Sequence, residues 1–447
     1  MKPADTRISG QGFGSVLRTR LVRAGLGTAA LRVIGLALTL GTSVLLARVM
    51  GPEGLGTYTL AFAAISLLGI PVQMGIPALV LRETARAQAV ADWPRLRGIW
   101  FWATRRILLV SALIALSVVV AVFTLPVLPD GARSVFLLGI PLIPVIALSQ
   151  IRAAALRGLG RVIWGQLPEI LIRPALLVLL VLACTAVVTL TPRLVMGLHL
   201  VAAAIAFTVG MALLMRARPA ELLQGGERQI DPTWARAVLS LALIAGAQSI
   251  TANADFLMLG WWQSEQQVGV YKVATSGASL TVAGLGVLAM ITNPRFAALH
   301  QTGDSRQLAR LAAYAAVLGF AAALPVLVIF AIWGAPILSA VFGPAFAGGA
   351  AAMLILTAGQ TLSAFFGACI GLLNMTGHER QAMRGVLISA LLNVALNVAL
   401  IPPFGIEGAA VATLISTAVW NLLLWWSVRR QLGLDSSVLG LWSWRRA

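Results

Sequence analysis

The most informative stretch of this sequence reads Asn253-Ala-Asp-Phe-Leu-Met-Leu-Gly-Trp-Trp-Gln-Ser-Glu-Gln-Gln-Val-Gly-Val-Tyr-Lys272. An apolar run that carries Asp255 is followed by a short polar turn with two tryptophans, and a second apolar run opens with Lys272. A hairpin over 261–267 would set the two charges at similar depth on neighbouring membrane helices. Because a charge near the centre of a membrane helix costs roughly 2.5–3.5 kcal/mol, the pair is either functional or a structural pair that neutralises itself.

The composition around this stretch is that of a membrane protein. Hydrophobic residues make up 59% of the 447 residues and charged residues only 11%, which excludes an ordinary soluble domain. Long apolar runs match a bilayer core of about 30 Å, and uninterrupted runs indicate helices, since barrel strands would alternate. We therefore expect an all-α polytopic membrane protein with about twelve spans: 25–48, 55–79, 102–125, 133–154, 168–190, 194–215, 236–260, 268–292, 311–333, 347–373, 385–402 and 408–428.

The net charge of +18 is explained by topology. With the N-terminus inside, nearly all of the 33 Lys and Arg residues fall at cytoplasmic ends of spans. Such a bias places both termini in the cytoplasm and makes a nucleic-acid-binding patch unnecessary. The exceptions are Arg48, Arg133 and Arg193 on the opposite side, and Arg32, Arg173 and Lys272 within spans.

Two internal echoes predict a duplicated architecture. Leu55-Gly-Thr-Tyr58 returns 213 residues later as Val268-Gly-Val-Tyr271, and Arg157-Gly-Leu-Gly160 returns 217 residues later as Asn374-Met-Thr-Gly377. Six-helix halves of this kind are parallel and related by an axis along the membrane normal. The predicted parts are a cytoplasmic amphipathic segment (1–24), an N-lobe (25–216), a cytoplasmic linker (217–235), a C-lobe (236–430) and a cytoplasmic interfacial tail (431–447).

Polar stripes on several spans predict a hydrated central cavity between the lobes. Such stripes must face protein or water rather than lipid, and the alternative is hydrogen bonding between helices. Arg32 either reaches the headgroups or lines the cavity, Glu169 and Arg173 are spaced to pair, and His199 is expected to be structural. The cavity candidates are Arg32, Arg173, Gln248, Thr251, Asp255, Lys272, Thr275, Ser276, Ser279, Gln360, Asn393 and Asn397.

The sequence offers little for catalysis or metal binding. Lys2 and Lys272 are its only lysines, so a Gly-rich phosphate loop ending in Lys is excluded. The three histidines are scattered, and Cys184 and Cys369 fall in spans, so we expect no metal site and no cofactor. Short outer loops weigh against an enzyme, and no catalytic residue is assigned.

Several stretches together carry a family resemblance. They resemble the polysaccharide (O-antigen type) flippase family of the multidrug/oligosaccharidyl-lipid/polysaccharide exporter superfamily. The resemblance covers about 25–430 and is specific for the family, not for the substrate. The stretches are Leu46-Ala-Arg-Val-Met-Gly-Pro-Glu-Gly-Leu-Gly-Thr-Tyr58, Asp255-Phe-Leu-Met-Leu-Gly260 with Val268-Gly-Val-Tyr271, Phe342-Gly-Pro-Ala-Phe346, Gly371-Leu-Leu-Asn-Met-Thr-Gly377, and Asn393-Val-Ala-Leu-Asn397 continuing into Pro402-Pro-Phe-Gly-Ile-Glu-Gly-Ala-Ala-Val-Ala-Thr413.

The resemblance implies two lobes around a cavity that opens alternately to either side of the bacterial cytoplasmic membrane. It implies translocation of undecaprenyl-diphosphate-linked oligosaccharide to the outer leaflet for surface polysaccharide biosynthesis, beside a polysaccharide polymerase and a chain-length regulator. Asp255 falls at the family's acidic position and is the candidate for coupling to a proton or sodium gradient. Arg32, Arg173 and Lys272 are the candidate cavity cations. The alternatives are a cation-coupled small-molecule or multidrug exporter, and a polytopic enzyme acting on lipid-linked sugars.

Overall fold

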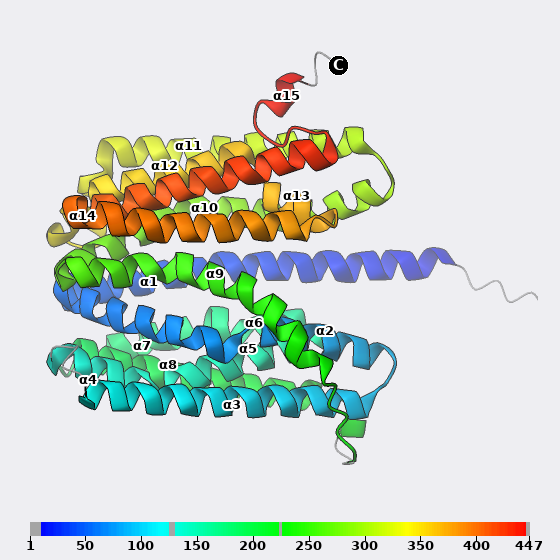
Figure 1. Cartoon of the computed structure of the whole chain (residues 1–447), viewed down its shortest axis with the longest axis horizontal. Helices are drawn as coiled ribbons and strands as arrows, with labels where there is room; N and C mark the ends of the chain where they lie inside the picture. Colours follow the sequence, from blue (N-terminus) through cyan, green and yellow to red (C-terminus); the bar gives the residue numbers. More distant parts are fainter. Residues whose placement is uncertain (1–9, 125–129, 223–225, 444–447) are drawn as a thin grey trace, which may run out of the picture.

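The structure, a computed structural model, describes residues 10–124, 130–222 and 226–443, and within them it contains helices and no strand (Figure 1). The prediction of an all-α polytopic membrane protein is confirmed. The first half consists of α1 (Gly10–Gln73), α2 (Ile76–Ala89), α3 (Trp93–Thr124), α4 (Asp130–Gly139), α5 (Leu142–Gly158), α6 (Val162–Leu167), the π-helical turn η1 (Pro168–Ile172), α7 (Arg173–Thr185) and α8 (Pro192–Ala217). The second consists of η2 (Ala220–Leu222), α9 (Thr233–Trp262), α10 (Glu265–Gln301), α11 (Ser305–Val341), η3 (Pro344–Gly349), α12 (Ala350–Phe366), α13 (Cys369–Met375), α14 (Glu379–Leu432) and α15 (Gly440–Ser443).

Eight helical segments of the described chain are long and apolar enough to cross a membrane. Two of them, in α1 and α14, fold back at a glycine with a non-helical backbone, Gly51 (φ 68°) and Gly405 (φ 56°), and so run the length of the bundle twice (Figure 1). Prolines beside these glycines favour the turns. Helices α9 and α10, with 30 and 37 residues, also run end to end, which brings the total to the twelve passes predicted.

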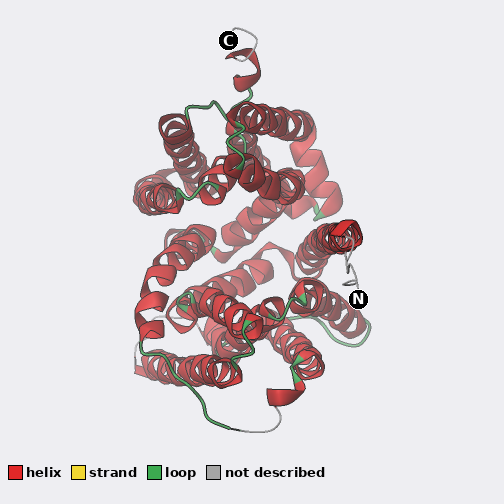
Figure 2. Cartoon of the chain, turned by 90° about the vertical axis from the view of Figure 1, so that its right-hand side faces the viewer, coloured by secondary structure: helices red, strands yellow, loops and turns green. Residues whose placement is uncertain are grey.

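The ends of these passes divide into two groups (Figure 1). The turns at Gly51, at Gly405 and between α9 and α10 lie at one end of the bundle. The start of α1, the α2–α3 connection, the linker between α8 and α9 and the end of α14 lie at the other, and Figure 2 looks onto that end. The arginine-rich connections therefore share one end, which we call the inner end after the orientation expected from the charge bias.

The predicted segment boundaries are only partly visible as breaks in the chain. Helix α1 continues through residues 24 and 25 without interruption, so no break in the backbone marks the expected boundary between the segment 1–24 and the N-lobe; residues 1–9 lie outside the described chain. Residues 10–24 contain no proline, which would interrupt the helix. The linker is the non-helical part between Ala217 and Thr233 that contains the short η2, and its residues 223–225 are not described.

The residues after α14 pack back onto the second half. Val438 N donates to Phe365 O at 3.0 Å, and Ser436 Oγ donates to Phe366 O at 3.2 Å. Asp435 accepts hydrogen bonds from Trp425 Nε1 (2.9 Å) and from the backbone and hydroxyl of Ser437 (3.0 and 2.7 Å). The expected interfacial tail is thus anchored to the bundle over residues 435–440; residues 444–447 lie outside the described chain.

Both sequence echoes have a structural counterpart. Gly160 and Gly377 each follow a helix and have left-handed φ values of 76° and 80°. The residue after each glycine donates its backbone N–H to the carbonyl five positions earlier, Arg161 to Leu156 at 2.9 Å and His378 to Leu373 at 2.8 Å. This is the glycine-dependent helix stop known from many folds, and the chain uses it at equivalent points of both halves.

The first echo marks the contact between the two halves. A Cβ atom added at Gly56 would collide with the carbonyl of Glu265, and one added at Gly269 would collide with the carbonyl of Pro52. These positions form two pairs that are 213 residues apart, the spacing of the echo. Helices α1 and α10 therefore cross with near two-fold symmetry at a place where the backbones touch, which requires glycine on both sides.

Polar contacts continue this junction at the outer end of the bundle. Thr57 donates a short hydrogen bond to the Glu265 carboxylate, and Arg48 donates through Nε to Val341 O at 2.7 Å. Closer to the middle, the hydroxyls of Ser43 and Ser276 lie 3.1 Å apart. The halves are thus joined from the outer end down to the level of Ser43.

Candidate functional site

A cavity of about 290 Å³ lies between the two halves. Both halves supply its walls, and the sequence predicted a polar cavity at this place. Its lining residues include Thr39, Thr42, Ser43, Tyr58, Thr59, Phe62, Glu169, Arg173 and His199 from the first half, and Ala252, Asn253, Phe256 and Lys272 from the second.

Two of the predicted cavity cations are present, and they come from different halves. Arg173, on the first turn of α7, is held by Glu169 one turn earlier, with 3.2 Å between Nη1 and Oε2; this is the predicted pair. Glu169 also contacts the buried guanidinium of Arg152, with 3.3 Å between Oε1 and Nη2. A carboxylate shared by two arginines leaves this wall with a net positive charge.

Lys272 supplies the cation on the opposite wall. Its Nζ lies 5.6 Å from the ring centroid of Phe256, a distance at which the ring face attracts a cation. Among the described residues, no carboxylate lies within ion-pairing distance of Lys272. Its charge is therefore available to an anion in the cavity.

Asp255 faces away from this cavity, so the predicted charge pair with Lys272 is wrong. The buried carboxylate of Asp255 accepts hydrogen bonds from Asn397 Nδ2 (2.7 Å), Thr413 Oγ1 (2.7 Å) and Tyr271 Oη (3.0 Å). The two residues do lie at a similar level of the bundle, as predicted. Phe256, next to Asp255, contacts Lys272, and Tyr271, next to Lys272, donates to Asp255. The predicted face was wrong: Asp255 lies about 100° around α9 from Phe256 and points to α14.

The polar stripe of α14 joins this acid rather than the cavity. Asn397 bridges Asp255 and Asn393, whose own amide lies 3.3 Å from Thr413 Oγ1. Both asparagines are fully buried, so assigning them to the substrate cavity is wrong. The alternative of hydrogen bonding between helices describes them correctly, because α14 folds back and pairs its two arms. We call Asp255, Tyr271, Asn393, Asn397 and Thr413 the acid cluster.

The remaining candidates are scattered. Ser276 meets Ser43 across the junction, whereas the hydroxyls of Thr251, Thr275 and Ser279 bond to carbonyls of their own helices. The exposed Arg32 and the half-buried Gln360 do not line the cavity. The side chain of Gln248 lies outside the described residues. No sequence pattern separates these residues from true cavity residues, since a hydroxyl on a membrane helix can donate to a carbonyl of its own helix.

The site also contains residues that sequence reasoning did not select. His199 Nδ1 lies 2.6 Å from Tyr58 Oη, and its ring stacks on Phe62 with 5.1 Å between centroids. Tyr58 and Tyr271 occupy equivalent positions of the echo, and each binds a titratable side chain of its own half, His199 or Asp255. The signal available was the scarcity of tyrosine, which occurs only three times in the chain.

The acid cluster is the only one of these features with ligands suited to a cation. It presents a carboxylate together with hydroxyl and amide oxygens, which are hard ligands. Within the described residues there is no group of three or more His, Cys, Asp and Glu side chains that could hold a metal ion.

The helical passes, the two halves and the cavity between them define a multi-pass membrane protein with a cavity between two six-pass halves. Its sequence matches the profile of the family described as polysaccharide biosynthesis protein over residues 22–300, and that of the lipid II flippase MurJ over 279–443. The first match covers more than half of the chain, which therefore belongs to the polysaccharide biosynthesis protein family.

Two curated relatives come from Haloferax volcanii. The chain is 30% identical over 172 residues to the probable flippase AglR, and 29% identical over 173 residues to a probable low-salt glycan biosynthesis flippase. Each match spans 38% of this chain and 36% of the relative.

Solved structures share the fold over nearly the whole chain. An inward-facing multidrug resistance MATE family transporter of the MOP superfamily superimposes with a TM-score of 0.73 at 14% identity, covering 91% of this chain and 98% of that one. Lipid II flippase MurJ in an inward closed conformation gives 0.72 at 13% identity, covering 94% and 92%. The fold of this chain is thus that of the MOP superfamily transporters.

Proposed function

We propose that this protein is a flippase that moves undecaprenyl-diphosphate-linked oligosaccharide from the inner to the outer leaflet by alternating access, for surface polysaccharide biosynthesis. The observation that carries the proposal is the cavity between the halves, with Arg173 on one wall and Lys272 on the other. Membership of the polysaccharide biosynthesis protein family and the flippase names of the relatives support it.

The two cations can bind a diphosphate headgroup in two different ways. Arginine offers a planar fork that can hold phosphate oxygens in pairs, while the lysine ammonium is a compact point charge. Thr42, Thr59 and Asn253 add donors and acceptors for sugar hydroxyls. The prenyl tail would stay in the surrounding lipid, because the cavity between the halves is far too small to hold it.

Outward movement of an anion is favoured by the membrane potential. With the inside negative, each negative charge gains about 2.3 kcal/mol per 100 mV on leaving the cytoplasmic leaflet. An ion gradient is then needed only for the return of the empty carrier. We assign that coupling to Asp255, with a proton or a sodium ion as the ligand of the acid cluster.

A cation-coupled exporter of small molecules or drugs is the competing function. Cationic drugs would prefer an acidic cavity, but the only lining carboxylate among the described residues is Glu169, and two arginines share it. An enzyme acting on lipid-linked sugars is the second competitor, and the described cavity lacks a free carboxylate or histidine pair for acid–base chemistry. On the proposed function, a polymerase and a chain-length regulator would receive the product.

The test is translocation of a fluorescent undecaprenyl-diphosphate oligosaccharide by the purified protein in sealed vesicles. Lys272→Ala should reduce the rate to that of protein-free vesicles, because the anion then meets only one wall. Lys272→Arg should restore part of the rate, since it keeps the charge but differs in size and hydration. The matched control is Arg380→Gln, which removes an exposed arginine at the inner end of α14. A normal rate in Lys272→Ala would overturn the assignment of this cavity, and export of cationic dyes with no glycolipid movement would favour the competitor.

A further inference from the structure

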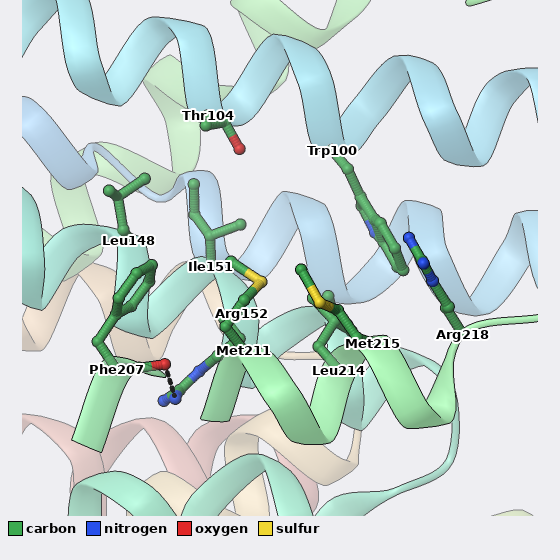
Figure 3. Close-up of a pocket in the computed structure, with 11 residues that line it drawn as sticks. Trp100, Thr104, Leu148, Ile151, Arg152, Phe207, Met211, Leu214, Met215 and Arg218 are labelled. Atoms are coloured by element: carbon green, nitrogen blue, oxygen red, sulfur yellow. Dashed lines mark hydrogen bonds between the residues drawn. The ribbon is translucent and has the colours of Figure 1, made fainter. Parts of the chain in front are cut away.

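A second cavity, of about 240 Å³, opens on the outside of the first half between α3, α5 and α8 (Figure 3). It shares no lining residue with the cavity between the halves. Apart from Arg152, Arg218 and Thr104, its walls are hydrocarbon, aromatic or thioether side chains: Trp100, Leu148, Ile151, Ala155, Phe207, Met211, Leu214 and Met215.

The cavity has the depth of one lipid leaflet. Arg218 lies just after the inner end of α8, and Phe207 lies 11 residues further up the same helix, about 16 Å at 1.5 Å per residue. That is about half of a hydrocarbon core of about 30 Å. Met215 at the rim is 55% exposed, and Phe101 and Leu108 on α3 are exposed as well. The opening therefore faces the acyl chains of the inner leaflet.

Basic residues surround the inner mouth of this slot. A shallower pocket of about 200 Å³ shares Trp100 and Arg218 with it and adds Arg97 and Arg228. Arg97 donates to the carbonyls of Glu227 (3.3 Å) and Glu221 (3.4 Å), and the Arg228 guanidinium lies 4.2 Å from the Phe101 ring centroid. In the described part of the chain, none of Arg97, Arg218 and Arg228 forms an ion pair with a carboxylate.

We propose that this slot is a binding site for an anionic diacyl phospholipid of the inner leaflet, with one acyl chain between α3, α5 and α8 and the headgroup phosphate among Arg97, Arg218 and Arg228. An apolar slot one leaflet deep that ends in unpaired arginines complements such a lipid in both shape and charge. Basic pockets between membrane helices at the cytoplasmic side bind anionic headgroups on the same physical grounds.

The floor of the slot links it to the cavity between the halves. Arg152 lies on that floor, and its Nη1 donates to Ala206 O (3.0 Å) and Phe207 O (3.3 Å; Figure 3). Its Nη2 contacts Glu169, the partner of Arg173. The Nε of Arg152 is buried without a hydrogen-bond partner. A bound acyl chain would therefore pack against the residue that positions the charged wall of the other cavity.

The test measures lipid binding by the purified full chain, using native mass spectrometry and thermal unfolding with added dioleoyl phosphatidylglycerol or dioleoyl phosphatidylcholine. Phosphatidylglycerol should bind and raise the melting temperature, while phosphatidylcholine should not. The double variant Arg218→Gln/Arg228→Gln should bind phosphatidylglycerol about thirtyfold more weakly, since each surface arginine contributes about 1 kcal/mol to an anionic lipid. Its matched control is Arg380→Gln/Arg384→Gln, which removes two exposed arginines from the inner end of α14.

A second pair of variants tests the apolar slot. Thr104→Trp should block the slot from the exposed face of α3 and weaken binding, whereas Leu108→Trp, one turn further along the same helix, should not. Equal binding of both lipids, or unchanged binding in Arg218→Gln/Arg228→Gln, would overturn the proposal. Displacement of phosphatidylglycerol by a short polyprenyl diphosphate would assign the slot to the substrate instead. None of these readouts depends on translocation. A negative result for lipid binding would therefore leave the proposed flippase function standing, and a negative translocation assay would leave the lipid site standing.

Discussion

Asp255 is the residue whose surroundings say most about coupling. Three donors from three segments converge on its carboxylate, and two of them, Asn397 and Thr413, lie on opposite arms of α14. An ion bound there would replace some of these hydrogen bonds and shift the two arms. On the proposed coupling, the acid cluster would convert ion binding into movement within the second half.

Asp255→Asn should keep the fold but remove the dependence of translocation on a proton or sodium gradient, because the amide is isosteric and uncharged. Asp255→Ala should also destabilise the protein by about 1–3 kcal/mol for each donor left unsatisfied. Thermal unfolding and transport at varied pH and sodium concentration check both statements. Thr251→Val is the control, since that hydroxyl bonds only to Ala247 of its own helix. An Asp255→Asn protein with an unchanged gradient dependence would rule out the assignment.

The level of a charged residue along its helix could be predicted from the sequence, but the direction in which its side chain points could not. The positions of Asp255 and Lys272 on either side of a hairpin followed from counting residues along apolar runs. Their faces depend on how α14 packs against α9, which is a long-range property with no local signature. Arg152 is a second example. Its sequence position predicts an arginine at the inner end, but its side chain is 2% exposed and donates to a carbonyl of α8.

Among the elements, the folded helices α1 and α14 were the easiest to predict. Gly-Pro and Pro-Pro-Phe-Gly sequences interrupt otherwise continuous apolar runs, and both turns fall where the helix reverses. The anchored tail was harder, because its contacts come from Asp435 and two serines rather than from an apolar periodicity. Its attachment uses the Asp435 carboxylate, which accepts a hydrogen bond from Trp425, beside the two hydrogen bonds to carbonyls of α12.

That carboxylate makes the tail sensitive to acid. Burial raises the pKa of Asp435, but hydrogen bonds from Trp425 and Ser437 outweigh it and hold the pKa below its ordinary value. The stabilisation is therefore present above the ordinary pKa of about 3.9 and is lost as the pH falls through the lowered value. At neutral pH, Asp435→Ala should release the tail.

Release can be followed at Cys369, whose Sγ lies 3.2 Å from Ser436 Oγ in a buried position. In a Cys184→Ala background, maleimide should label Cys369 faster in Asp435→Ala than in the parent protein. Gln431→Ala, an exposed change one turn earlier, should leave the rate as it was. Equal labelling rates in all three proteins would show that the tail does not protect this thiol.

For the whole molecule, an important property is that the halves touch at the outer end and enclose a cavity below that contact. The contact runs from Arg48 and Thr57 at the outer end to the Ser43–Ser276 pair. In the alternating access that we propose, such a contact must separate to expose the cavity to the other side. The conformation described here is therefore closed at the outer end.

A crosslink across that contact should stop the cycle. Ser43→Cys/Ser276→Cys, in a background without Cys184 and Cys369, places two thiols where hydroxyl oxygens are 3.1 Å apart, close enough for a disulfide after small adjustments. Oxidation should abolish translocation, and dithiothreitol should restore it. Thr39→Cys/Ser276→Cys, with one cysteine a turn earlier on α1, should remain active under oxidant. Full activity of the crosslinked Ser43→Cys/Ser276→Cys protein would mean that the halves need not separate there.

The crossing at Gly56 and Gly269 also limits how this chain can evolve. Each glycine lies against a backbone carbonyl of the segment that contains its own repeat counterpart, so a larger residue at either position would collide with backbone atoms. No side-chain substitution elsewhere can relieve such a collision, because the obstructing atoms belong to the main chain. A duplicated gene usually lets its two copies diverge, but at this pair neither copy can change first. The two positions are thus fixed together, and they should be among the last traces of the repeat to disappear.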